Sequence, residues 1–126
     1  MLKGKNAVIT GCNRGIGKAI LNLFAENGAN IWACVRASDS DFESYCDHLA
    51  VRTGMSIKVI NFDLADPEKI KTAAKEISSD KKPIDILVNN GGISQRGLFL
   101  ETDFSVYRRI MDVNYLGTVA LTKVVL

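Results

Sequence analysis

The chain has 126 residues, 47% of them hydrophobic and 24% charged, which is typical of one globular domain with a buried core. Its formal net charge of +2 is too small to predict binding to nucleic acid or to an anionic membrane surface. No apolar run approaches the roughly 20 residues of a membrane span, and Met1–Lys5 leave no room for a signal peptide, so we expect a cytoplasmic protein.

Short apolar runs alternate with helical repeats along the chain. Apolar side chains that recur every three or four residues predict helices, and the short runs between them predict strands buried on both faces. Gly28 is expected to end the first helix, Ser38–Asp41 to cap the second, and Pro67 to open the third. The predicted strands are Asn6–Thr10, Ile31–Val35, Ile57–Phe62 and Ile84–Val88. The predicted helices begin near Ile16, after Ser38–Asp41, at Asp66 and Pro67, and near Asp103, the last one running to the end of the chain.

Strands that alternate with helices at this spacing predict a parallel sheet with right-handed crossovers. We therefore expect an α/β fold with a doubly wound, Rossmann-like parallel sheet of about four strands and helices on both faces. Residues 1–126 would form the dinucleotide-binding portion of one such domain. Ligands of these sheets bind beyond the carboxyl ends of the strands, so the functional residues should follow the strands directly.

A glycine-rich loop, Thr10–Gly17, joins the first strand to the first helix. Its spacing, G-x-x-x-G-x-G, provides a tight turn, close approach to a pyrophosphate, and close packing of the helix on the sheet. Backbone N–H groups at the positive end of a helix favour phosphate binding. The residues expected to contact a dinucleotide here are Gly11, Asn13, Arg14, Gly15, Ile16 and Gly17.

Arg36 and Asp63 follow the second and third strands. Arg36 stands about where a NAD-binding fold places an acidic residue for the ribose 2′-hydroxyl. Two guanidinium groups, on Arg14 and Arg36, suit a 2′-phosphate and favour NADP(H) over NAD(H), although both could be solvated surface charges. Because Asp66 can cap the next helix, we expect the Asp63 carboxylate to be free to accept a hydrogen bond from an adenine amino group. A strand-end cap is the alternative for Asp63.

Asparagines mark the last two candidate positions. Asn90 and Gly91 belong to the Asn89–Gly92 segment after the fourth strand, where amides can satisfy strand-end backbone groups and glycines allow close approach to a cofactor. A plain turn is the alternative. Asn114 falls on or beside the inner face of the last predicted helix, where an amide needs a partner, and we interpret it as a functional amide or an ordered-water site. A satisfied core amide is the alternative. That inner face is predicted to consist of Val106, Ile110, Val113, Gly117, Leu121 and Val124.

The cysteines and the single histidine indicate neither a disulfide nor a metal site. Cys12, Cys34 and Cys46 form no CxxC pair and are odd in number, so we expect reduced thiols. We interpret Cys12 as a small loop residue rather than a redox group. His48 lies two residues after Cys46, but two potential ligands do not make a metal site, so no metal is expected.

These motifs resemble those of the short-chain dehydrogenase/reductase family. Thr10–Gly17 resembles its T-G-x-x-x-G-x-G loop, and Asp63 with Leu64 resembles its adenine-contacting pair. Asn89–Gly92 resembles its N-N-A-G strand end, with a glycine in place of the alanine, a change expected to loosen the loop without removing a contact. Asn114 resembles the asparagine of its catalytic tetrad.

Within the family, the first half of the chain is most similar to bacterial 3-oxoacyl-[acyl-carrier-protein] reductases. The segment Asn89–Leu126 also resembles the vertebrate dehydrogenase/reductase member 7 group, so a chimeric or engineered origin is an alternative. The resemblance implies an NADP(H)-dependent oxidoreductase that reduces a small-molecule carbonyl to an alcohol by hydride transfer, as 3-oxoacyl groups are reduced in fatty acid biosynthesis. Asn114 would support the proton relay.

The family's chemistry also needs a serine and a Tyr-x-x-x-Lys pair, in which the lysine lowers the pKa of the tyrosine. The chain contains no Tyr-x-x-x-Lys, and its apolar last helix, Val119–Leu126, lacks a cap. We therefore expect the cofactor-binding part of an enzyme of roughly 250 residues, inactive alone, that forms homo-oligomers through its last helix. A non-catalytic nucleotide-binding half-domain is the alternative, and the sequence does not identify a substrate.

Overall fold

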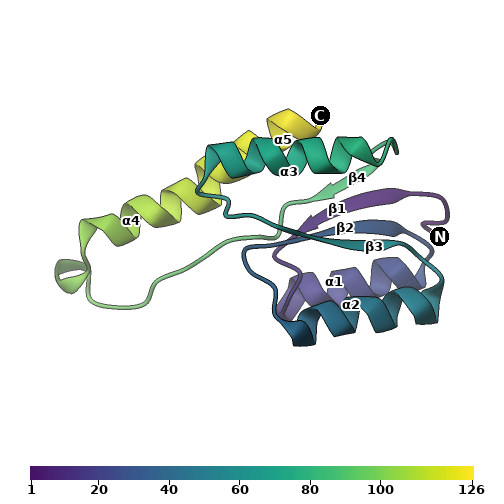
Figure 1. Cartoon of the computed structure of the whole chain (residues 1–126). Coiled ribbons are helices and arrows are strands. Elements are labelled where there is room, and N and C mark those ends of the chain that lie inside the picture. The colour runs from purple at the N-terminus through teal and green to yellow at the C-terminus, as the bar shows by residue number, and fades with distance from the viewer.

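The computed structural model, which describes residues 1–126, has three layers with a parallel sheet in the middle (Figure 1). The four strands lie in the order β3-β2-β1-β4, and every neighbouring pair is parallel. This order confirms the predicted doubly wound, Rossmann-like sheet, since β2 and β3 extend the sheet on one side of β1 and β4 pairs with its other side. The strands are β1 (Asn6–Thr10), β2 (Asn30–Val35), β3 (Ile57–Asn61) and β4 (Ile86–Val88).

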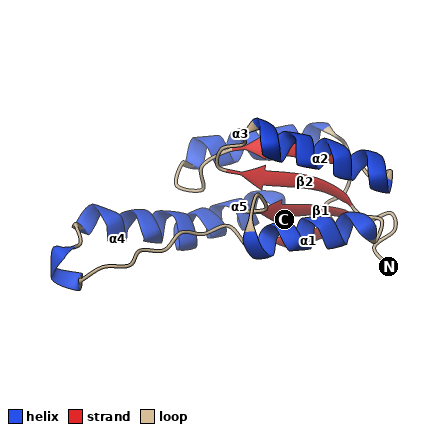
Figure 2. Cartoon of the chain, turned by 90° about the horizontal axis from the view of Figure 1, so that it is seen from below, coloured by secondary structure: helices blue, strands red, loops and turns tan.

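Helices cover both faces of this sheet. α1 and α2 lie on one face and α3 and α5 on the other, whereas α4 extends beyond the sheet, as Figures 1 and 2 show from two directions. The α-helices are α1 (Gly15–Glu26), α2 (Ser40–Thr53), α3 (Pro67–Ser79), α4 (Phe104–Met111) and α5 (Thr118–Val125). A 3₁₀ turn, η1 (Phe99–Glu101), precedes α4, and a π-helical segment, η2 (Asp112–Gly117), joins α4 to α5.

The core consists of two apolar clusters, one on each face of the sheet. β1 is buried along its whole length, and its side chains alternate between the clusters because successive residues of a strand point to opposite faces. Ala7 and Ile9 pack with Leu21 of α1, whereas Val8 packs with Leu121 of α5. Burial on both faces explains why β1 and β2 are apolar runs rather than alternating sequences.

Three of the helices begin at aspartates that cap them. Asp39, Asp66 and Asp103 accept hydrogen bonds from backbone N–H groups in the first turns of α2, α3 and α4. The predicted caps of α2 and α3 are therefore confirmed, as is the role of Gly28, which has a φ of +94° just after α1. α1 differs from these three helices, because its N-cap is Arg14 and no side chain caps it.

The last predicted helix begins after Asp103 and continues to Val125, as expected, but its middle turn is not α-helical. The π-helical turn η2 lies between α4 and α5. Of the predicted inner face, Val113, Gly117 and Leu121 are buried. Val124 of the predicted inner face is 44% exposed, which corrects its placement, and its neighbour Val125 packs against the core. No helix of the chain combines the length and the apolar character needed to cross a membrane.

Candidate functional site

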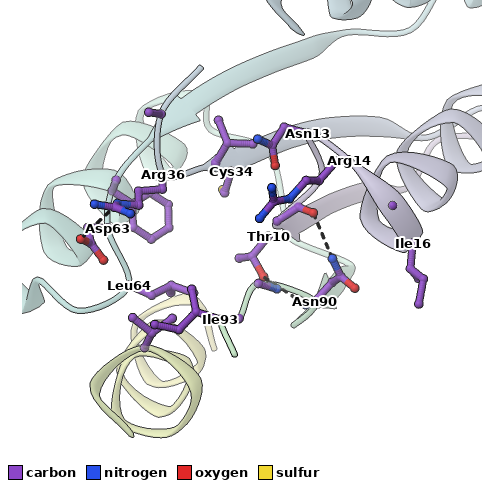
Figure 3. A pocket seen from close by; sticks show the side chains of 18 of the residues that line it. Thr10, Asn13, Arg14, Ile16, Cys34, Arg36, Asp63, Leu64, Asn90 and Ile93 are labelled. Carbon is purple, nitrogen blue, oxygen red and sulfur yellow. Dashed lines mark hydrogen bonds and ion pairs between the residues drawn. The ribbon is translucent and has the colours of Figure 1, made fainter. Parts of the chain in front are cut away.

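A pocket of about 530 Å³ opens at the carboxyl ends of the strands, within the size range of small-molecule sites. Figure 3 shows side chains from the β1–α1 loop, the end of β2 and the segment after β3 around one hollow. The sequence predicted eleven dinucleotide-contacting residues, and all except Gly17 line this pocket. They are Gly11, Asn13, Arg14, Gly15, Ile16, Arg36, Asp63, Leu64, Asn90 and Gly91.

The β1–α1 loop turns tightly because of its glycines. Gly11 and Gly15 have φ values of +65° and +57°, a left-handed conformation that favours glycine. Gly17 lies behind the loop, where a Cβ atom would collide with the carbonyl oxygen of Gly11 and with the amide of Asn90. The glycine spacing thus lets the first turn of α1 lie directly against the end of β1.

The N-terminus of α1 lies at the pocket and gives this part of it a positive charge. Arg14 is its N-cap residue, no acidic side chain lies in its first turn, and no side chain accepts from its N–H groups. Arg14, Gly15 and Ile16 all line the pocket. The unpaired N–H groups of a first helical turn, together with the helix dipole, favour an anion such as a phosphate.

A hydrogen-bond network joins the end of β4 to this loop. The Thr10 hydroxyl oxygen accepts from the N–H groups of Asn90, at 3.1 Å, and Gly91, at 2.7 Å. The Asn90 side-chain amide donates to the carbonyl oxygen of Gly11 at 3.0 Å. Asn90 therefore satisfies a backbone group at the strand ends, as predicted. Asn89 instead donates to the Thr122 hydroxyl at 3.2 Å.

Gly91, which was expected to loosen its loop, lies in close contact with its neighbours. Its N–H group is held by Thr10, and a Cβ atom at Gly91 would lie 3.0 Å from both the Thr10 hydroxyl oxygen and a Leu64 methyl carbon. The residue therefore lies in a narrow space between the end of β1 and the segment after β3. Glycine fits this space, and alanine would have to displace a neighbour.

The Asp63 carboxylate is not free, which corrects another expectation. Its Oδ1 accepts from the N–H group of Ala65 at 2.9 Å. Its Oδ2 accepts from Nη2 of Arg109 at 2.9 Å and lies 3.6 Å from Nε of Arg36. Burial pushes the pKa of this carboxyl upward, but the Ala65 hydrogen bond and the guanidinium groups of Arg109 and Arg36 outweigh burial and hold the pKa below its ordinary value.

Arg109 is a pocket residue that the sequence did not indicate. It lies in the last turn of α4 and lines the pocket together with Val113 of η2. No local pattern distinguishes it from its neighbour Arg108, which is exposed and has no recorded hydrogen bond or ion pair. Only the path of the chain, which brings α4 over the segment after β3, reveals that Arg109 contacts Asp63.

Asn114 is exposed on η2, next to the buried Val113, so it lies beside the inner face rather than on it. Its amide nevertheless has a partner, as expected for a side chain with a defined position. The Asn114 oxygen accepts from the N–H group of Ile93, and its nitrogen donates to the carbonyl oxygen of Ile93, both at 2.8 Å. Asn114 therefore fixes the loop after β4, and it does not line the pocket.

The buried thiols are held in their neutral form. Burial raises the pKa of Cys12 to about 12 and that of Cys46 to about 11. Because the thiolate is the reactive form, Cys12 acts as a small buried residue under the glycine loop. Cys34 is also free and buried, and no group of three or more His, Cys, Asp or Glu side chains could hold a metal ion.

The fold and the pocket together define a Rossmann-like protein with an anion-favouring site at the carboxyl edge of its sheet. Residues 5–126 match the family described as short chain dehydrogenase. The chain therefore belongs to the short-chain dehydrogenase/reductase family.

Similarity to individual relatives extends over nearly the whole chain. Dehydrogenase/reductase SDR family member 7B of Xenopus laevis is 40% identical over 99% of the chain, which corresponds to 40% of that protein. The 3-oxoacyl-[acyl-carrier-protein] reductase of Vibrio cholerae is 37% identical over 99% of the chain and 49% of that protein. The chain thus spans less than half the length of these relatives. Both relatives align with the chain along nearly its whole length.

Solved structures of the same family share this fold. L-sorbose reductase of Gluconobacter frateurii, complexed with NADPH and L-sorbose, superposes with a TM-score of 0.89 at 29% identity, over 98% of this chain and 47% of that one. A 3-oxoacyl-[acyl-carrier protein] reductase of Brucella melitensis, in complex with NAD, has a TM-score of 0.84 at 32% identity, over 96% and 47% of the two chains. Both coenzymes therefore occur among structures similar to this one.

Proposed function

We propose that the chain forms the coenzyme-binding part of an NADP(H)-dependent oxidoreductase that interconverts a small-molecule carbonyl, such as a 3-oxoacyl group, and an alcohol. The observation that carries the proposal is the coincidence of three features around one pocket. These are the uncapped N-terminus of α1, the glycine turn under it, and the guanidinium groups of Arg14 and Arg36. A pyrophosphate with a nearby 2′-phosphate would satisfy all three.

The residues around the pocket fit the parts of this coenzyme. Gly11, Asn13, Gly15 and Ile16 lie where backbone groups at the start of α1 would bind a pyrophosphate. Because Gly17 has no side chain, the first turn of α1 lies close to Gly11 and Asn90. Gly91 gives a similar close approach at the end of β4, where Thr10 and Asn90 hold the backbone in place.

The adenosine side of the pocket fits NADP(H) better than NAD(H). Arg36 follows β2, in the place where an acidic residue would bind the 2′-hydroxyl group of NAD(H). An acid there would repel a 2′-phosphate, and a guanidinium group attracts it. Leu64 offers an apolar surface beside Asp63, where an adenine ring could pack.

Bound NADPH would supply the hydride, and the residues of this chain would bind and orient it. Asn114 contributes by holding the loop after β4 through its two hydrogen bonds to Ile93. No Tyr-x-x-x-Lys pair occurs in the chain. We therefore assign coenzyme binding, rather than proton transfer, to these 126 residues, and expect them to show no turnover by themselves.

Parallel titrations of the chain with NADPH and NADH test this proposal. We expect NADPH to bind about tenfold more tightly, since charge-assisted hydrogen bonds to the 2′-phosphate are worth more than 1 kcal/mol. Arg36→Asp should remove or reverse this preference, because it replaces the cation with a repelling carboxylate. Calorimetry measures both affinities. Equal affinities that Arg36→Asp does not change would refute the choice of coenzyme, and absence of binding would refute the function.

A further inference from the structure

Asp63 lies between two guanidinium groups that come from distant parts of the chain. Arg36 follows β2, and Arg109 belongs to α4. Figure 3 shows the Arg36 side chain directed toward Asp63 beside the pocket. One carboxylate therefore has two cationic neighbours, and all three side chains line the same pocket.

The two arginines do not hold Asp63 equally. Nη2 of Arg109 donates to Oδ2 of Asp63 at 2.9 Å, a distance typical of a charge-assisted hydrogen bond. Nε of Arg36 lies 3.6 Å from the same oxygen, too far for a good hydrogen bond. The Arg36 side chain is also 71% exposed, compared with 37% for Arg109. Arg109 is thus the main partner of the carboxylate, and Arg36 remains free to turn.

The difference between these two contacts with Asp63 determines the net charge at the adenosine side of the pocket. Arg109 offsets the single negative charge of Asp63, so the charge of Arg36 is left over. Without Arg109, Arg36 would be the only ion-pair partner of Asp63. The Arg36 guanidinium would then be drawn to the carboxylate, and a 2′-phosphate would compete with Asp63 for it.

We propose that Arg109 is a positioning residue for coenzyme selection, which pairs with Asp63 and thereby leaves Arg36 available to a 2′-phosphate. This role rests on the proposed function, because it concerns the difference between NADPH and NADH. It assigns to α4 a task at the coenzyme pocket, which Arg109 lines. The ion pair also joins α4 to the segment after β3.

The test compares Arg109→Gln with Arg108→Gln, a variant that loses the same charge one residue away on the exposed side of the helix. We expect Arg109→Gln to weaken NADPH binding about three- to fivefold, the range that an ion pair of this exposure supports. NADH binding should change less than twofold. Arg108→Gln should leave both affinities near those of the unaltered chain, and Arg109→Lys should restore part of the preference for NADPH.

Two further measurements separate this role from a merely structural one. The pKa of the Asp63 carboxyl, followed by NMR, should rise in Arg109→Gln and not in Arg108→Gln, because only Arg109 hydrogen-bonds to it. Adding Asp63→Asn to Arg109→Gln should recover the preference for NADPH, since the carboxylate that competes for Arg36 is then neutral. Loss of the fold would instead weaken the binding of both coenzymes in all Arg109 variants.

The possible results lead to different conclusions. An unchanged ratio of the two affinities in Arg109→Gln would overturn the role of Arg109 and leave the proposed function intact. An equal loss for NADPH and NADH would also overturn it, because Arg109 would then act on the part that both coenzymes share. An unaltered chain that binds neither coenzyme would overturn the proposed function, and this inference with it.

Discussion

Gly17 packs against Gly11 and Asn90 at a point where no side-chain atom fits. Gly17→Ala would push a methyl group into the carbonyl oxygen of Gly11, so either the loop or α1 must move. We expect a loss of about 1–3 kcal/mol in the free energy of unfolding, as is usual for overpacking. Thermal denaturation measures this loss. NADPH affinity should fall at least about tenfold, because the backbone groups of the loop no longer converge on one anion.

Gly54→Ala is the matched control for this prediction. Gly54 lies just after α2 with a φ of +75°, and a Cβ atom there would have open space around it. Its replacement should cost about 1 kcal/mol through backbone strain alone and should leave coenzyme affinity unchanged. If Gly17→Ala bound NADPH as tightly as the unaltered chain, close packing of the loop would not be needed for the site.

The position of single residues could be predicted where a local pattern determines the geometry. The glycine spacing and the position of Arg36 after β2 were enough to place both at the pocket. The environment of Asp63 could not be predicted in this way, because its main partner, Arg109, follows 46 residues later. Arg109 and Arg108 look alike in the sequence, and only the tertiary fold decides which one reaches the carboxylate.

At the scale of elements, most bounds followed from caps and periodicity, but the π-helical turn inside the last helix did not. β1 and α3 agree with their predicted starts, since a buried apolar run and Pro67 with its Asp66 cap are local signals. The π-helical turn η2 has no such signal. It forms where Gly117 packs against the carbonyl group of Leu64, a contact between segments far apart in the chain.

One prediction concerns the contact between β2, β3 and the end of α3. Asp80, after α3, accepts from the Trp32 indole N–H at 2.7 Å and pairs with Lys58 at 3.3 Å. The Trp32 hydrogen bond, followed by Lys58, holds the pKa of Asp80 below its ordinary 3.8, although burial opposes this. Because the fold lowers the pKa of Asp80, the charged carboxylate stabilises the fold at pH values above the ordinary pKa. This stabilisation is lost as the pH falls through the lowered pKa.

Trp32 is the only tryptophan, so its fluorescence reports this contact directly. We expect an emission change with a midpoint below pH 3.8, absent in Asp80→Asn and shifted upward in Lys58→Gln. Lys5→Gln, a lysine change with no recorded contact to Asp80, should not move the midpoint. A midpoint at or above the ordinary value in the unaltered chain would contradict the role of these hydrogen bonds.

At the scale of the whole molecule, the body of the sheet and the projecting α4 differ in what they expose. The sheet is covered on both faces, whereas η1 and α4 extend beyond it (Figures 1 and 2). Large apolar side chains are exposed on this projecting part, which is unusual for a surface without a partner. They include Leu98, Phe99, Leu100, Phe104 and Met111.

We expect this projecting surface to cause self-association of the chain. A second copy would bury apolar area on both partners, and the net charge of +2 gives little repulsion between copies. Sedimentation at increasing concentration, up to tens of micromolar, should show a mass above the 13.8 kDa of one chain. Leu100→Glu or Phe104→Glu should shift the equilibrium toward the monomer, because each would place a charge in the buried area. Val51→Glu, at an 84% exposed position on α2, should not. A chain that stays monomeric over the whole range, or that responds equally to all three changes, would contradict association through η1 and α4.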